Sequence, residues 1–157
     1  MNEPLLHWPA PAMLGVSAIR LALAAGLGAL IGAERERVHS AAGLRTHMLV
    51  GLGSALFVLT MIESGADGAA LSRVIQGLTT GIGFLGAGTI LKIGDKAEVH
   101  GLTTAASIWV TAAVGVAAGL GHVWLAGVAS LLGWLVLGPI KRLEKAPKAG
   151  PPTDGPR

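Results

Sequence analysis

The chain has 157 residues, of which 52% are hydrophobic and 13% are charged, with a formal net charge of +3. A soluble domain carries roughly 25% charged residues, spread along its helix and strand faces, whereas here the charges gather between long apolar stretches. We therefore predict an integral membrane protein, with the lipid bilayer as its first partner. Nucleic-acid binding is excluded, because the positive charge lies in loops and a tail where anionic lipid is the expected counter-charge.

Five apolar stretches are long enough to cross a bilayer as helices, which takes about 20 residues each. Their apolar runs are continuous and lack the alternation of barrel strands, so the predicted fold class is all-α and polytopic. Residues 1–13 form an N-terminal segment, 14–140 the five-helix membrane domain, and 141–157 a Pro- and Gly-rich tail that we expect to be disordered. The expected spans are 14–33, 46–62, 71–91, 102–121 and 122–140.

Lysine and arginine predict the orientation, since they stay on the cytoplasmic side of short loops. The segments 34–45, 92–101 and 141–157 hold ten of the twelve lysines and arginines. We therefore expect the N-terminus outside, the C-terminus in the cytoplasm, and a multi-pass protein of the plasma membrane. The first 19 residues contain no lysine or arginine, so a cleavable signal peptide is not expected.

The first inner loop, "GAERERVHSAAGLRTH" at 32–47, concentrates ionisable groups at the membrane boundary. Glu34 and Arg35 end the first span, while Arg45 and Thr46 begin the second, so the loop returns them to similar depth. Two interpretations remain open. A Glu34–Arg45 ion pair would clamp the two helices together, or these charges are solvated anchors at the interface.

Polar residues also enter the expected spans. Arg20 and Arg73 lie near the outer ends of theirs, where an arginine either snorkels to water or finds a partner. For Arg73 the candidate partners are Glu63 and Asp67, and Gln76 follows one turn later. The fourth span opens with Thr103 and Thr104 and continues to Trp109; its hydroxyls either bond to their own helix or form part of a site.

The stretch "TTGIGFLGAGTI" at 79–90 carries four glycines in an otherwise apolar span. One interpretation is helix packing through small residues, as expected also for the pairs Gly77/Gly81, Gly28/Gly32 and Gly115/Gly119. The other is a locally broken or cavity-lining helix whose freed carbonyls coordinate a cation. The four glycines, Gly81, Gly83, Gly86 and Gly88, do not share one helix face, which keeps the second interpretation open.

Three motifs taken together, "GALIGAERER…AGLRTH" (28–47), "GIGFLGAG" (81–88) and "GLTTAASIWVTAAVGVAAGLG" (101–121), resemble the MgtC/SapB family of bacterial inner-membrane proteins. The resemblance covers about 15–140. It implies a link with magnesium homeostasis, growth at low magnesium and, in some pathogens, survival inside macrophages. It also implies the F-type ATP synthase as a partner, which such proteins restrain.

Two departures from the family pattern stand out. Many members have an aspartate a few residues before the arginine that precedes the glycine motif, whereas this chain has "GAALSRVIQG" there. Longer relatives carry a soluble ACT-like C-terminal domain, which the residues after 140 are too few to form. We therefore expect regulation through such a domain to be absent.

The residues favour a non-catalytic regulator over a transporter. Mg²⁺ binds through carboxylates and retained waters, yet no Asp or Glu lies inside an expected span, so a transporter or channel with a cavity lined by the Gly81–Gly88 backbone is the alternative. No cysteine is present and the five histidines are dispersed, so an enzyme is not expected. No cofactor is expected, Mg²⁺ excepted, and its ligands are unknown. The small-residue faces predict a homo-oligomer.

Overall fold

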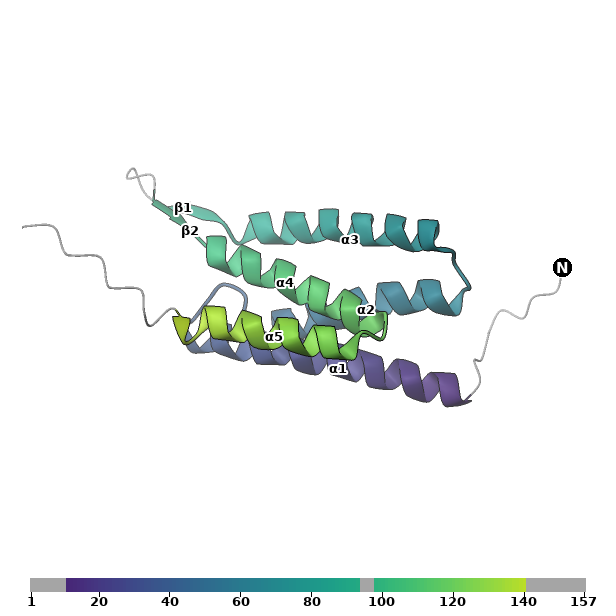
Figure 1. The fold of residues 1–157 in the computed structure, drawn as a ribbon. Coiled ribbons are helices and arrows are strands. Elements are labelled where there is room, and N and C mark those ends of the chain that lie inside the picture. The colour runs from purple at the N-terminus through teal and green to yellow at the C-terminus, as the bar shows by residue number, and fades with distance from the viewer. Residues whose placement is uncertain (1–10, 94–97, 141–157) are drawn as a thin grey trace, which may run out of the picture.

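A computed structural model of the chain describes residues 11–93 and 98–140. The described chain forms five helices that run up and down in a bundle (Figure 1). The helices are α1 (Pro11–Arg37), α2 (Leu44–Glu63), α3 (Gly68–Gly88), α4 (Leu102–Gly119) and α5 (Val123–Leu137). The predicted helical architecture is therefore observed, with the first helix beginning at Pro11 inside the segment 1–13 that we assigned to the N-terminus. The expected disordered tail, 141–157, lies outside the described residues.

Three of the helices, α1, α2 and α4, are long and apolar enough to cross a membrane. α5 is apolar but has only 15 residues. α3 has the length, at 21 residues, but its arginine, glutamine, threonines and glycines dilute its hydropathy. That all five helices cross the membrane, and that the N-terminus lies outside, remain predictions.

A two-stranded β-hairpin was not predicted from the sequence. Strands β1 (Leu91–Ile93) and β2 (Glu98–His100) pair antiparallel between α3 and α4, with Lys92 opposite Val99. The third expected span was extended to residue 91, but α3 ends at Gly88, where the Thr89 hydroxyl donates to the Gly86 carbonyl at 2.8 Å. The missed signal is local: β-branched residues flank a Gly-Asp pair, which is a typical hairpin pattern.

α4 is the central helix and packs against all four others. Its buried face includes Ser107, Thr111, Gly115 and Gly119, at helical spacing. A Cβ at Gly115 would meet the carbonyl oxygen of Gly51 on α2, and one at Gly119 would lie 2.8 Å from the carbonyl oxygen of Ala55. Such close backbone approach is how helices gain van der Waals contact in lipid, where the hydrophobic effect does not drive them together.

The glycine pair on α1 packs in the same way. A Cβ at Gly28 would lie 2.5 Å from the His47 carbonyl oxygen, and one at Gly32 would lie 2.8 Å from the Cα of Leu44. The packing role expected for Gly28/Gly32 and Gly115/Gly119 is thereby confirmed. α1, α2, α4 and α5 form the closely packed body of the molecule, which we call the four-helix body.

α3 lies at the edge of the bundle (Figure 1) and packs mainly on α4. Only Ile82 and Gly86 are buried on it. A Cβ added at Gly77, Gly81, Gly83 or Gly88 would meet nothing within 4 Å. The packing contacts expected of Gly77 and Gly81 are therefore not made inside one chain.

The broken-helix interpretation of α3 is wrong. Residues 68–88 form one uninterrupted helix, with Asp67 accepting from the Ala70 amide at 2.7 Å at its start. The carbonyls before its last turn are engaged in helical bonds, so no break inside the helix frees them for a cation. The cavity-lining part of that interpretation holds for Gly81, which lines a groove beside α2 together with Gly77.

Candidate functional site

A cluster of polar side chains joins three helices at the end of the bundle where α1 stops and α2 and α4 begin. We call it the polar cluster: Arg35, Ser40, His47, Thr104 and Ser107. Four of the five side chains are buried, and Ser40 is half-buried. The resemblance motifs at 28–47 and 101–121 therefore meet in space, although about 60 residues separate them along the chain.

Arg35 is the charged centre of this cluster. Only 6% of the residue is exposed. One terminal nitrogen, Nη2, donates to Ser40 Oγ at 3.1 Å and to Thr104 Oγ1 at 3.3 Å, and the two hydroxyls lie 2.8 Å apart. Its Nε has no hydrogen-bond partner within the described chain. Since a buried charge is costly unless it is bonded, these hydroxyls hold α1 to α4.

His47 makes the second connection, from α2 to α4, and is fully buried. Its Nδ1 lies 2.8 Å from the Gly43 carbonyl oxygen, which only accepts, so Nδ1 carries a proton. Its Nε2 lies 3.0 Å from Ser107 Oγ, which is also 2.8 Å from the Thr104 carbonyl oxygen. The Ser107 hydroxyl has a single proton, which it donates either to the Thr104 carbonyl or to Nε2 of the neutral ring, and the Nδ1 bond to Gly43 holds the ring in both cases.

Of the two interpretations of the inner loop, the Glu34–Arg45 ion pair does not form among the described residues. Glu34 is buried and accepts from Arg37 Nη1 at 3.1 Å, while its carboxyl group packs against Gly138 after α5. Glu34 and Arg37 are three residues apart on α1, so this pair lies within one helix and does not connect α1 to α2. Helix rotation explains the difference, because Leu44 lies against Gly32 of α1, whereas the next residue, Arg45, is exposed and lines a groove shared with α3.

Arg45 and Thr46 are exposed and line one end of a groove between α2 and α3. Neither side chain caps α2: its first amide, Leu44 N, donates to Glu36 Oε2 at 3.0 Å. The structure therefore divides the inner-loop motif into two environments. Arg35 turns into the protein, and Arg45 turns toward the surroundings.

Two predicted residues of α3, Arg73 and Gln76, are exposed. Neither Glu63 nor Asp67 pairs with Arg73 in the part of the chain that the structure describes, since Glu63 accepts from Ser17 and Asp67 caps α3. Arg20 does find a partner, because its Nη1 donates to the Gly119 carbonyl oxygen at 3.1 Å. Of the glycines Gly81, Gly83, Gly86 and Gly88, only Gly86 packs inside the chain, against Ala105.

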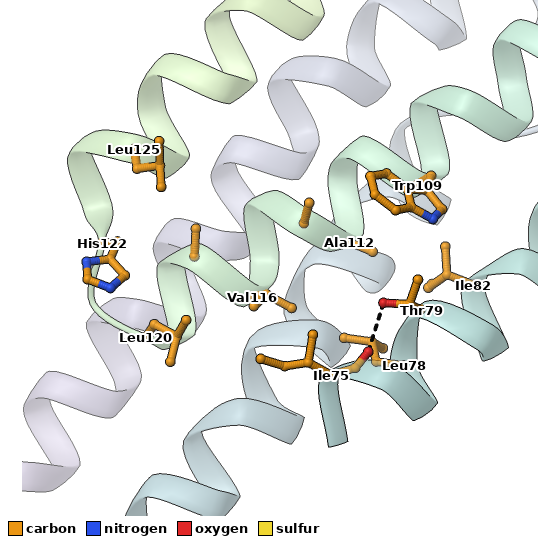
Figure 2. A pocket seen from close by; sticks show the side chains of 12 residues that line it. Ile75, Leu78, Thr79, Ile82, Trp109, Ala112, Val116, Leu120, His122 and Leu125 are labelled. Carbon is orange, nitrogen blue, oxygen red and sulfur yellow. Dashed lines mark hydrogen bonds between the residues drawn. The ribbon is translucent and has the colours of Figure 1, made fainter. Parts of the chain in front are cut away.

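The two remaining predicted residues, Thr103 and Trp109, are exposed on α4 and line different cavities. Trp109 borders a cavity of about 310 Å³ between α3 and α4, opposite Ile82 and Thr79 (Figure 2). The Thr79 hydroxyl donates to the Ile75 carbonyl oxygen at 2.8 Å, so this hydroxyl is already used by its own helix. Neither cavity includes a residue of the polar cluster other than Ser107.

Ser40, His47 and Ser107 were not among the predicted site residues. Spacing could have found two of them. His47 is in register with the buried Gly51, Ser54 and Val58 of α2. Ser107 similarly precedes Thr111 and Gly115 by four and eight residues on α4. Ser40 lies in a loop, where no periodic signal exists.

The carboxylates and histidines of the described ranges are dispersed: no three of them lie close enough together to hold a metal ion. Most buried polar side chains of the bundle instead bond to protein groups, as Ser130 Oγ does when it donates to the Leu27 carbonyl oxygen at 2.8 Å; the buried Ser54 Oγ has no partner among the described residues. The arrangement ties α1, α2, α4 and α5 together at several depths. Chemically it acts as a set of interhelical hydrogen bonds.

The pairing at the inner loop can be tested by double-mutant cycles. We expect Arg35→Met and Thr104→Val to be coupled by about 1.5 kcal/mol in the free energy of unfolding, because they share a buried charged hydrogen bond. Glu34→Gln and Arg45→Gln should show coupling near zero. Denaturation in mixed micelles measures both cycles, and strong coupling of Glu34 with Arg45 would contradict this geometry.

Comparison with known proteins places these features in a family context. The MgtC family model matches residues 21–146. The chain is 45% identical over 143 residues to protein SrpB of Synechococcus elongatus, covering 84% of this chain and 78% of SrpB. It is 45% identical over 126 residues to the putative magnesium transporter YhiD of Escherichia coli K12, and 47% identical over 96 residues to protein MgtC of Salmonella typhimurium LT2.

The coverage of the longer relatives is partial. The matched region is 76% of this chain and 58% of YhiD, and 61% of this chain and 40% of MgtC. No solved structure matches the chain.

Proposed function

The chain belongs to the MgtC family, and from that premise we propose that it is a multi-pass inner-membrane regulator without catalytic activity, connected with magnesium homeostasis and growth at low magnesium. It acts by binding other membrane proteins through α3. The F-type ATP synthase, which the family resemblance suggests, is one candidate target. Because the chain spans only part of YhiD and MgtC, their whole-protein activities enter here as proposals.

One observation carries the proposal: α3 presents a polar face away from the bundle. We call it the α3 outer face: Ser72, Arg73, Gln76, Thr80, Gly83 and Ala87. From Arg73 onward these residues recur every three or four positions along the helix, Ser72 lies next to Arg73, and all are exposed. Thr80 donates to the Gln76 carbonyl, but the Arg73 and Gln76 side chains bond to nothing in the described chain.

Lipid is a poor environment for such a face. Arg and Gln side chains inside a bilayer are costly, and such residues commonly bond across helix–helix interfaces. Gly83 and Ala87 add a surface on which another backbone can lie close. The face therefore fits a helix of another membrane protein, either a target or a second copy of this chain.

The polar cluster supports the same proposal from inside the bundle. Arg35 and His47 bond to Thr104 and Ser107 of α4 and so hold α1, α2 and α4 together. A regulator needs such a fixed scaffold behind its binding face. The loops at 37–44 and the β-hairpin lie at one end of the bundle, together with the end of α5 (Figure 1), which is the arrangement that our five-crossing orientation requires.

Magnesium transport is the second candidate, favoured by the printed name of YhiD as a putative magnesium transporter. In this chain Mg²⁺ would then be the cargo, moving in its hydrated form. The two functions make opposite predictions for the purified protein.

We expect the full chain in proteoliposomes to show no saturable Mg²⁺ flux, measured with an enclosed magnesium indicator. In a bacterial strain that lacks its own copy and grows poorly at low magnesium, the wild-type chain should restore growth. The double variant Arg73→Ala, Gln76→Leu should lose most of that restoration at equal membrane abundance, because it removes the polar groups offered to a partner.

The matched control is Thr60→Leu, a polar-to-apolar change on the exposed surface of α2, where the hydroxyl bonds only to the Leu56 carbonyl. This control should restore growth fully. A saturable flux in the wild type would overturn the regulator proposal, as would full growth restoration by the double variant.

A further inference from the structure

A long groove separates α2 from α3 on the side opposite the α3 outer face. Its inner part, about 400 Å³, is lined by Arg45, Thr46, Gly53 and Phe57 of α2 and by Leu78 and Leu85 of α3, among others. Its continuation, about 490 Å³, shares Phe57, Leu78 and Leu85 and reaches Val74, Gly77 and Gly81. The groove stays open because glycines line both walls: a Cβ at Gly53, Gly77 or Gly81 would meet nothing within 4 Å.

The groove has a polar end and an apolar length. Arg45 and Thr46 supply a guanidinium and a hydroxyl at the start of α2, and the residues beyond them are apolar except for Ser54. From Arg45 to Phe57 the groove follows α2 for about 18 Å, at a rise of about 1.5 Å per residue. Half of a hydrocarbon core of about 30 Å is about 15 Å. The apolar part thus matches the depth of one leaflet.

We propose that this groove binds one anionic phospholipid, with its phosphate on Arg45 and Thr46 and an acyl chain between α2 and α3. Charge complementarity selects the anionic headgroup, because Arg45 makes no ion pair among the described residues and guanidinium binds phosphate oxygens well. The first amide of α2 does not contribute to the site, because Leu44 N already donates to Glu36 Oε2. The site is independent of the proposed regulatory function.

Such a lipid would complete the contact of α3 with the bundle. α3 packs mainly on α4, and its contact with α2 is slight. An acyl chain in the groove would join Phe57 of α2 to Leu78 and Leu85 of α3. The bound lipid would therefore fix the distance between α3 and the four-helix body.

Native mass spectrometry of the full chain tests the proposal. The detergent-purified protein is offered equal amounts of phosphatidylglycerol and phosphatidylcholine with the same acyl chains. We expect one tightly retained lipid with a preference for phosphatidylglycerol. Arg45→Gln should lower that preference about tenfold, as for the loss of one charge-assisted hydrogen bond. Gly53→Leu should remove retention of both lipids, because its side chain fills the groove.

Two matched controls separate the site from general effects. Arg37→Gln removes one positive charge near the same end of the bundle, outside the groove, and should leave the preference unchanged. Gly127→Leu makes the same glycine-to-leucine change on α5, where a Cβ also meets nothing within 4 Å, and should retain the lipid. Thermal unfolding of each variant confirms that the fold survives.

Three outcomes would overturn the proposal. Equal loss of preference in Arg37→Gln would show a diffuse surface charge effect. Displacement of the lipid by excess inorganic phosphate would show a soluble-anion site. Conversion of a dimer into a monomer by Gly53→Leu, without loss of lipid, would show that a second copy of the chain occupies the groove.

Discussion

Replacing Gly115 by alanine is expected to destabilise the folded protein by about 3 kcal/mol, because the new methyl group has no space. It would point at the carbonyl oxygen of Gly51 and lie 2.8 Å from the Cβ of Ser54. Both contacts are with α2 itself, so relief requires α2 and α4 to move apart. The free energy of unfolding in mixed micelles, followed by tryptophan fluorescence, measures the effect.

The control is the same substitution at Gly127 on α5, where a Cβ meets nothing within 4 Å. Alanine there should leave stability unchanged or raise it by about 0.5–1 kcal/mol, since glycine weakens a helix interior. Only the Gly115 change should thus lower the stability. Equal effects at the two positions would contradict the close approach of α2 and α4.

Replacing His47 by alanine is expected to lower the free energy of unfolding by about 3 kcal/mol, because it leaves a cavity and removes two side-chain contacts. The ring is fully buried and reaches both the Gly43 carbonyl and the Ser107 hydroxyl. Its loss releases the start of α2 from α4. Denaturation in mixed micelles gives the change in stability.

Ser107→Ala provides the partner for a double-mutant cycle, and the two changes should be coupled because the side chains touch. His122→Ala is the matched control, since that histidine is exposed at the start of α5 and makes no side-chain cap bond there. It should change stability by less than about 0.5 kcal/mol. A His47 effect no larger than that of His122 would contradict the buried contact.

Sequence reasoning predicted the helices well because lipid imposes a strong and simple constraint. Continuous apolar runs of about 20 residues leave few structural choices, and helices were found within each of the five expected spans. The β-hairpin at 91–100 was not predicted, because its Gly-Asp turn signal is local and its three-residue strands add little pattern beside a neighbouring apolar run. Helix ends are set by local caps such as Thr89, which composition does not reveal.

The site was predicted only in part, because the direction of a side chain depends on how its helix is rotated about its own axis within the bundle. Arg35 and Arg45 are ten residues apart and looked equivalent at the boundary, yet the first is buried and the second is exposed. The same holds for glycines. Gly115 and Gly81 are both small residues in apolar helices, but only Gly115 faces a neighbouring backbone. Which face is covered depends on how the helices are arranged around α4, and that is tertiary information.

The shallow attachment of α3 has an energetic consequence. Because only Ile82 and Gly86 are buried on this helix, releasing it would cost a local free energy smaller than that of global unfolding. A molecule that binds to α3 can therefore shift the population of docked and released helix while the remainder stays intact. Binding at this edge would therefore move α3 alone, while the four-helix body keeps its arrangement.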